Sequence, residues 1–355
     1  MRRELGMMAA FLLMCAALWS SNHTFLGPSN VLNTSREISR LGIFAVGVGI
    51  VIITGGIDLS IGSIVGLTGV IIAKLSSPST DTDAYMHYPM WVGITVAMTV
   101  AVGLGFFQGW LITRMDLQPF IVTLGGMLLF RGIAQVITRG GTLSFGDSAL
   151  PGNMEASLIT YHGWTILSTP LLVFLIVMIG AAYLLHFSVF GRYVYAIGGS
   201  RDAAAYSGIP VRKVEMITYV ISATCAGLAG VCETYVGSMM HTNGIAYELS
   251  AIAAAVIGGC SLRGGEGTVF GILIGCGIIR VIRNGINLFK LTYTVKGIKQ
   301  EFRLDTNWND VIIGSVILLA VILDQLVHIA QAKRRTRKAA EIAAAKLREG
   351  AAVPA

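Results

Sequence analysis

Residues 41–76 read LGIFAVGVGIVIITGGIDLSIGSIVGLTGVIIAKLS, and this stretch decides the fold class. One apolar run precedes the polar segment GGIDLSIGS, residues 55–63, and another follows it. Apolar runs of about twenty residues can cross a bilayer as α-helices, whereas a transmembrane barrel shows segments of about ten residues with alternating polarity. The stretch therefore predicts two membrane-spanning helices, at 41–56 and 59–76, joined by a polar break.

The same pattern recurs on both sides of this stretch. Further spans are predicted at 5–19, 91–113, 118–138, 166–187, 213–237, 248–261, 267–287 and 309–329. We expect an all-α integral membrane protein, a bundle of about ten transmembrane helices with broken or re-entrant segments, filling residues 1–332. The first run is expected to remain as a helix rather than to be removed as a signal, because no convincing small-x-small cleavage site precedes Asn22.

The composition excludes a water-soluble fold. Of the 355 residues, 54% are hydrophobic and only 13% are charged, against about a quarter charged in an ordinary soluble domain. The net charge of +7 does not indicate a nucleic-acid partner, because the basic residues lack the interleaved aromatic residues of a stacking surface. The cysteines lie in apolar runs without the spacing of a metal site, and we expect them to be packing residues. They are Cys15, Cys225, Cys232, Cys260 and Cys276.

Charge placement predicts the orientation. Basic residues concentrate at the amino terminus, in the loop 188–213 and in the tail 333–355, which is how a membrane protein marks its cytoplasmic side. Both termini are therefore expected in the cytoplasm, with the tail as a separate basic segment attracted to anionic lipid. The loops 77–90 and 140–165 contain no Lys or Arg and are expected outside.

Two segments disagree with this orientation. Arg36 and Arg40 fall on the predicted outer side, and we expect them to belong to an interfacial helix end. The stretch 287–310 is also basic, and it is long for the connection before the last span.

Asp58 interrupts the deciding stretch with a carboxylate. An aspartate at the bilayer centre costs about 2.5 to 3.5 kcal/mol even on the lenient insertion scale, so it is expected in the protein interior, in a water-filled cavity or at a membrane surface. Gly55 and Gly56 permit a helix break, which occurs at membrane depth where it lines a cavity. Two interpretations stand side by side: a solute pathway, or a tight turn in which Asp58 caps the second helix.

A similar layout occurs in the other half of the chain, where residues 258–271 read GGCSLRGGEGTVFG. The match favours an internal duplication, which is common in transporters that move one repeat against the other.

The loop 191–215 reads GRYVYAIGGSRDAAAYSGIPVRKVE. Ser200 can cap a short helix, Asp202 suits its first turn, Gly208 can end it in a left-handed conformation and Pro210 prevents continuation. We expect a two-turn helix on the cytoplasmic face. One interpretation is a solvated connector. The other is a narrow ridge that enters a groove on a partner, formed by Ala203, Ala204 and Ala205.

Residues 191–230 resemble the cytoplasmic coupling loop and following helix of permeases from the ABC importers of ribose, xylose, arabinose, galactose and autoinducer-2. Three further blocks occur in the family's order, so the resemblance covers most of the chain. They read NVLNTSREISRLGIFAVGVGIVIITGGIDLSIGS, LQPFIVTLGGMLLFRGIAQVITRGGT and YELSAIAAAVIGGCSLRGGEGTVFG.

The resemblance implies a permease subunit of a homodimer or heterodimer in a bacterial inner membrane. Its implied partners are cytoplasmic ATP-binding subunits, which hold ATP and Mg, and a periplasmic or extracellular sugar-binding protein. In such importers the coupling helix enters a groove of the ATPase, which maps here onto residues 200–208. The residues expected at this contact are Arg192, Gly199, Ser200, Arg201, Asp202, Ala203, Ala204, Ala205, Gly208 and Arg212.

The expected function is import of a monosaccharide, ribose-like or xylose-like, by a chain that is not itself an enzyme and holds no cofactor or metal. No GxxxxGK[ST] run is present for binding nucleotide, and the histidines form no HExxH or Ser/His/Asp pattern. Related permeases carry nucleosides or branched-chain amino acids, and these solutes remain alternatives. An ion-coupled secondary transporter, with Asp58 as the ion-binding group, is a further one.

Sugar passage needs hydroxyl-compatible groups in a mostly apolar wall. The predicted pathway residues are Asp58, Ser60, Thr123, Asn284 and Asn287, with Phe120 as a stacking wall.

Overall fold

The computed structural model describes residues 2–76, 86–146, 152, 156–162, 164–295, 298–303, 308–309, 311–316, 318–319, 322 and 325. The chain divides into two compact units, Met1–Trp308 and Asn309–Ala355. The predicted domain boundary at 332 lies outside the described residues. Of the predicted last span, 311–316 is helical.

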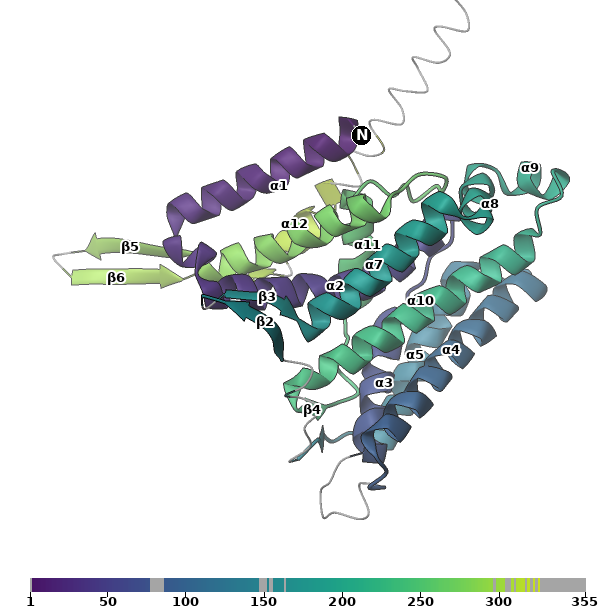
Figure 1. Cartoon of the computed structure of the whole chain (residues 1–355), viewed down its shortest axis with the longest axis horizontal. Helices are drawn as coiled ribbons and strands as arrows, with labels where there is room; N and C mark the ends of the chain where they lie inside the picture. Colours follow the sequence, from purple (N-terminus) through teal and green to yellow (C-terminus); the bar gives the residue numbers. More distant parts are fainter. Residues whose placement is uncertain are drawn as a thin grey trace, which may run out of the picture. The chain divides into compact units, whose positions relative to one another are not determined.

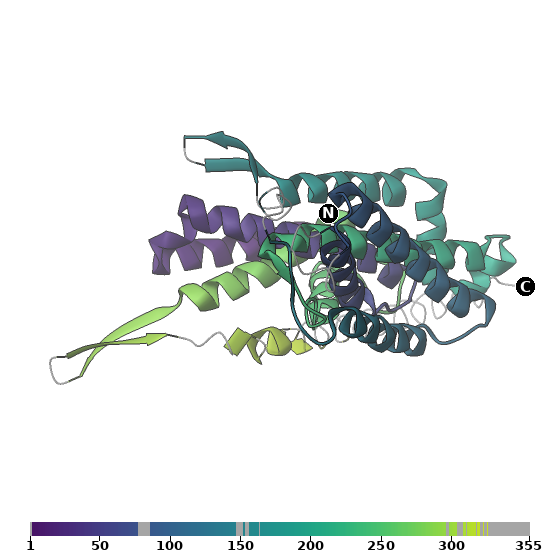
Figure 2. The same ribbon diagram turned by 90° about the horizontal axis from the view of Figure 1, so that it is seen from below.

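The first unit is built from helices (Figures 1 and 2). They are α1 (Arg2–Ser21), the 3₁₀ turn η1 (His23–Leu26), α2 (Pro28–Ile53), α3 (Ile61–Ser76), α4 (Met90–Arg114), α5 (Pro119–Thr138), α7 (Thr169–Phe187), α8 (Val189–Gly199), α9 (Arg201–Tyr206), α10 (Val211–Glu233), the 3₁₀ turn η2 (Thr234–Val236), α11 (Tyr247–Ile257) and α12 (Val269–Leu288). Antiparallel two-stranded pairs connect some of them. The pairs are β1 (Leu143–Ser144) with β4 (Ser238–Met239), β2 (Ser157–Tyr161) with β3 (Trp164–Ser168), and β5 (Lys290–Val295) with β6 (Ile298–Arg303).

Within the described part, six helices are long and apolar enough to cross a membrane, namely α1, α4, α5, α7, α10 and α12, while α3 and α11 are shorter and apolar. This confirms the expected all-α membrane fold. The long basic stretch before the predicted last span contains the β5–β6 hairpin.

The helix that contains most of the predicted span 41–56 is longer than that span, because α2 begins at Pro28. Proline at the first helical position is preorganised for helix entry. The polar stretch after it is enclosed by neighbouring helices, so Arg36 and Arg40 are buried within α2 rather than at an interfacial helix end.

α10 lies at the centre of the packing, against α2, α3 and α4 (Figure 1). Close approach of backbones is possible where glycine faces the neighbour, which is how helices associate in lipid. At Gly47 of α2, for example, a Cβ atom would lie 2.9 Å from the Cα atom of Ser222 in α10. The shared surface of α2 and α10 therefore depends on small residues.

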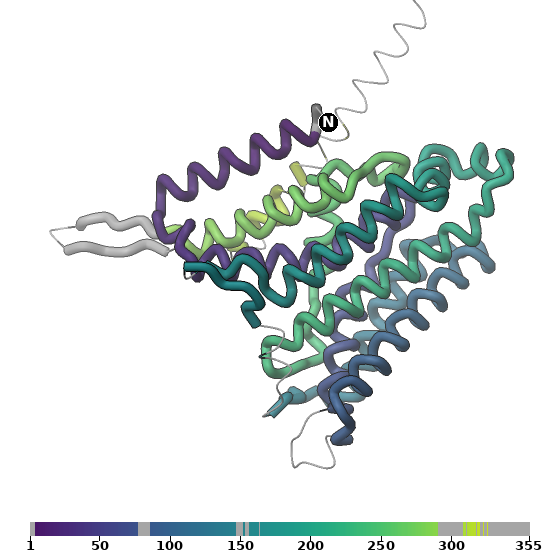
Figure 3. The backbone as a smooth tube through the Cα atoms, viewed as in Figure 1, coloured from purple at the N-terminus to yellow at the C-terminus, as the bar shows by residue number. Residues whose placement is uncertain are grey.

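The two glycine-rich breaks meet at one end of the unit, which we call the α9 end (Figure 3). The connection 54–60 joins α2 to α3, and the connection 258–268 joins α11 to α12. Gly265 N–H, in the second connection, donates to the carbonyl oxygen of Ile53, the last residue before the first, at 2.8 Å. The internal duplication suggested by their sequences stays a prediction.

Candidate functional site

Helix α9 has the caps that its sequence predicts. The Ser200 hydroxyl accepts from Ala203 N–H at 3.3 Å. Gly208 adopts φ +80° and donates its N–H to Ala205 O at 3.0 Å. A left-handed residue after the last turn is a common way to end a helix. The two-turn helix is therefore confirmed.

The predicted ridge of three alanines is corrected by the structure. Ala204 is only 4% exposed and faces the interior, because three consecutive helical residues spread over about 200° and cannot share one face. Four of the exposed residues form what we call the α9 face: Asp202, Ala203, Ala205 and Tyr206. Tyr206 is 93% exposed.

Arg201 connects α9 to two other elements. Its Nε donates to Glu215 Oε1 at 2.8 Å and its Nη2 to Glu215 Oε2 at 3.3 Å. Nη2 also lies 3.7 Å from Asp116 Oδ1, in the turn between α4 and α5. The hydrogen bonds that Arg201 donates to Glu215 are the main cause of its raised pKa. The guanidinium therefore joins α9 and α10 to the α4–α5 turn.

The other predicted coupling residues lie on the helices that precede and follow α9 in the sequence. Gly199 ends α8, and Arg192 is exposed on the same helix; Arg212 is exposed in the first turn of α10.

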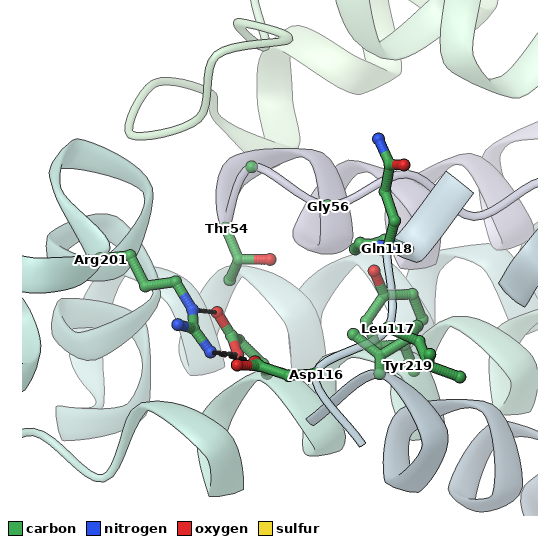
Figure 4. Close-up of a pocket in the computed structure, with 11 residues that line it drawn as sticks. Thr54, Gly56, Asp116, Leu117, Gln118, Arg201 and Tyr219 are labelled. Carbon is green, nitrogen blue, oxygen red and sulfur yellow. Dashed lines mark hydrogen bonds and ion pairs between the residues drawn. The ribbon is translucent and has the colours of Figure 1, made fainter. Parts of the chain in front are cut away.

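A pocket of about 260 Å³ lies beside Arg201 (Figure 4). One wall is the start of the α2–α3 connection, where Thr54, Gly55 and Gly56 lie, and the opposite wall includes Glu215 and Tyr219 of α10. A Cβ atom on Gly56 would lie 2.5 Å from the Tyr219 hydroxyl. This close approach accounts for the second glycine of the motif.

Asp58 lies deeper in the same connection and is 1% exposed. Its Oδ1 accepts from Ser60 N–H at 3.0 Å and from the Ser60 hydroxyl at 2.7 Å, and its Oδ2 accepts from the Ser222 hydroxyl at 2.7 Å. The Gln108 side-chain amide is 3.0 Å from Ser60 Oγ. Asp58 thus forms an Asx turn directly before α3 and fixes the break against α10.

The predicted pathway residues fall into two groups. Thr123 lies beside Asp58 and Ser60, since its hydroxyl is 3.3 Å from Ile57 O, and Phe120 is exposed one turn earlier on α5.

The remaining pair lies elsewhere. Asn284 exchanges side-chain hydrogen bonds with Asn30 at 3.1 and 2.8 Å, and Asn287 is exposed near the end of α12. Because Asn30 and Ile53 are separated by about 35 Å of helix, this pair lies at the opposite end from α9.

Residues that sequence reasoning did not single out complete the site. Glu215, Tyr219 and Ser222 recur at helical spacing on one side of α10, and they contact Arg201, Gly56 and Asp58 respectively. The signal available in the sequence was this i, i+4, i+7 spacing of polar side chains, which shares one helix face.

A second buried charged cluster was also missed. Arg40 Nε lies 3.4 Å from Glu233 Oε2, and its guanidinium carbon lies 4.0 Å from the Tyr235 ring centroid. The Tyr247 hydroxyl donates to Glu233 Oε1 at 2.6 Å. Among the described residues, no group of three His, Cys, Asp or Glu side chains could hold a metal ion.

Comparison with known proteins gives a consistent result. Residues 30–321 match the family model described as branched-chain amino acid transport system / permease component. The chain is 34% identical over 319 residues to the ribose import permease protein RbsC of Escherichia coli K12, covering 89% of this chain and 91% of the relative. It is 37% identical over 287 residues to RbsC of Haemophilus influenzae, covering 80% and 85%. It is 30% identical over 375 residues to the xylose transport system permease protein XylH of Escherichia coli K12, covering 90% of each. No solved structure matches.

Proposed function

The chain belongs to the branched-chain amino acid transport system / permease component family, and from that premise we propose that it is the membrane-spanning permease subunit of an ATP-driven monosaccharide importer. The observation that carries the proposal is the near-full-length similarity to permeases named for ribose and xylose. A pentose is the preferred solute, because both names specify one.

The α9 face is the proposed contact with a cytoplasmic ATPase. It is exposed and lies on a capped helix, and its Ala205 lines a pocket together with Arg114, Arg212 and Lys213; Arg192 is exposed on α8, the helix before α9. Basic residues mark the cytoplasmic side, so the α9 end is cytoplasmic in this proposal. Thr268 donates to Glu4 Oε1 at 2.8 Å, which supports an amino terminus on that side. The opposite end would meet a sugar-binding protein, and a second permease subunit would complete the pathway.

The proposed transmission route runs along α10. Movement of α9 by the ATPase acts on Arg201, and the paired hydrogen bonds to Glu215 pass the movement to α10. Ser222, about two turns further on, is bonded to Asp58. The α2–α3 connection would then shift together with α10, changing the side to which the bundle opens.

The test is reconstitution in liposomes with the cognate ATPase and binding protein. Uptake of labelled ribose, xylose, uridine and leucine is measured with ATP, with a non-hydrolysable analogue, and with a proton or sodium gradient instead. We expect accumulation of a pentose that requires ATP hydrolysis. Uptake that follows an ion gradient without ATP would overturn the ATP-driven mechanism. ATP-driven uptake of uridine or leucine alone would overturn the solute.

A further inference from the structure

A second pocket at the α9 end, of about 1080 Å³, shares Arg201 and Ala205 with the route described above, but most of its lining residues lie outside that route. It opens between the last turns of α4 and the start of α10, and the α9–α10 connection forms its third side. Its volume lies just above the usual range for small-molecule sites, about 300 to 1,000 Å³. A ligand of substantial size is therefore required to fill it.

The walls of this pocket change in chemistry along α4. Phe106 and Trp110 are 51% and 42% exposed and lie on a helix that is long and apolar enough to cross the membrane. Arg114 follows in the last turn of the same helix. From Phe106 to Arg114 the helix rises about 12 Å. An exposed aromatic surface on a candidate membrane-spanning helix thus leads directly into a basic one.

All the charged residues that line the pocket are basic: Arg114, Arg201, Arg212 and Lys213. Arg201 is already bonded to Glu215. In the part of the chain that the structure describes, the ion pairs do not involve Arg114, Arg212 or Lys213. Three cations therefore face a pocket that contains no carboxylate of its own.

We propose that this pocket binds one anionic phospholipid from the leaflet on the α9 side. The phosphate lies among Arg114, Arg212 and Lys213, and an acyl chain lies along Phe106 and Trp110. Basic pockets between transmembrane helices on the cytoplasmic side recognise anionic headgroups, and tryptophan is favoured at the membrane interface. The inference rests only on the charge and shape of this pocket, so it does not depend on which solute the chain carries.

Such a lipid would also touch the connection that positions α9. Ala205 and Ile209 line the pocket, and Ile209 N–H donates to Ala204 O at 3.1 Å. Occupancy would therefore stabilise α9 in the position described here.

The test uses the full chain in nanodiscs and in detergent. Native mass spectrometry measures retained lipid, and thermal unfolding measures the shift on adding phosphatidylglycerol, phosphatidylcholine with the same acyl chains, or glycerol 3-phosphate. We expect phosphatidylglycerol to bind at least tenfold more tightly than phosphatidylcholine and to raise the unfolding midpoint. The soluble headgroup should produce little of that rise.

Matched variants locate the site. The triple variant Arg114→Gln, Arg212→Gln, Lys213→Gln should weaken phosphatidylglycerol binding about tenfold or more, and Trp110→Ala should weaken it several-fold. Arg192→Gln removes an exposed cation at the same end that does not line the pocket, and it should bind as the wild type does. If the triple variant does not fold, Lys213→Gln alone serves with an expected loss of a few-fold.

Three results would overturn the proposal. One is equal binding of the two phospholipids, and another is undiminished phosphatidylglycerol binding by a folded variant. The third is displacement of the lipid by the ATPase together with loss of ATPase binding in the triple variant, which would make the pocket a protein contact.

Discussion

Asp58 shows how a single charged residue is accommodated inside an apolar bundle. Its carboxylate accepts three hydrogen bonds, two from Ser60 and one from Ser222, which is 164 residues away. Hydrogen bonds to charged groups contribute about 1.5 to 3 kcal/mol each, and a buried polar group without partners is costly. The residue therefore holds the break in place, whether or not it also contacts solute.

Replacing Asp58 tests this role. Asp58→Asn keeps the size of the side chain but removes the charge and places an NH₂ group where donors already converge. We expect a loss of about 1–3 kcal/mol in unfolding free energy, measured by denaturation in detergent. Ser222→Ala, which removes one donor and leaves the carboxylate bonded to Ser60, should cost less. An Asp58→Asn protein as stable as the wild type would contradict the structural role.

Arg201 and Glu215 are paired at the surface, where ion pairs contribute about 0–1 kcal/mol to stability. We therefore expect Arg201→Gln, Glu215→Gln and the double variant to unfold within about 1 kcal/mol of the wild type. Solute transported per ATP hydrolysed should fall in each single variant, and the double variant should be no worse than either single one. Arg139→Gln, which removes an exposed positive charge that belongs to no proposed contact, is the control for loss of charge alone. Additive losses in the double variant would exclude a shared action of the pair.

At the scale of elements, α9 presents side chains of opposite character one residue apart. Ala203 is exposed and Ala204 is buried. Ala203→Arg should leave the unfolding midpoint within a few degrees of the wild type and weaken binding of the ATPase. Ala204→Arg should lower the midpoint, because it forces a charge into a buried site that has room only for a methyl group. Both are checked by thermal unfolding and by co-purification of the ATPase. A greater effect on ATPase binding from a folded Ala204 variant would contradict the assignment of the α9 face.

Helix α8 is anchored to the second break by Tyr195, whose hydroxyl donates to Gly267 O at 2.7 Å. Burial, with smaller effects of Cys260 and Glu4, raises the pKa of Tyr195 to about 12. The folded state therefore favours the protonated phenol, and this contribution is complete below the unfolded pKa of about 10. It is lost as pH rises towards 12.

The corresponding prediction concerns alkaline denaturation. The wild type should lose stability between about pH 10 and pH 12 more steeply than Tyr195→Phe, which has no proton to lose. Denaturant unfolding at several pH values measures the two slopes. Parallel slopes would exclude titration of Tyr195 from this range.

At the scale of the whole unit, the membrane spans could be predicted from the sequence, because a long apolar run is what a helix needs to cross the lipid bilayer. The start of α2 could not be predicted in the same way. The residues around Arg36 and Arg40 are polar, and they are buried only because other helices pack around them. The caps of α9 were predicted, because capping depends on neighbours in sequence.

The partners of the candidate site were beyond the sequence for a different reason. The sequence predicts that Asp58 does not face lipid. It does not identify the partner Ser222, because this residue is distant in the chain and its hydroxyl is like that of many other serines. Ala204 was expected on the exposed ridge. A two-turn helix is too short for the spacing of its hydrophobic residues to indicate which side is buried. Asn284 was grouped with Asp58 by chemistry alone, although about a helix length separates them.

The two ends of the unit can be tested for their sides of the membrane. Tyr206→Cys and Asn287→Cys, each in a Cys15→Ser background, should react with a membrane-impermeant maleimide from opposite sides. Labelling is compared in intact spheroplasts and in inverted vesicles, where Tyr206→Cys should react only in the latter. Labelling of both positions from one side would contradict a transmembrane arrangement of α12.

Near α9, three segments meet with backbone directly against backbone. A Cβ atom on Gly198 would lie 2.3 Å from Gly265 N and closer still to Ile53 O, so the end of α8 is in direct contact with the last residue of α2 and with the connection 258–268. No side chain lies between them whose change of rotamer could absorb a displacement. This junction is consequently rigid. A shift at the end of α8 must also displace Ile53 in the first half of the chain and Gly265 in the second.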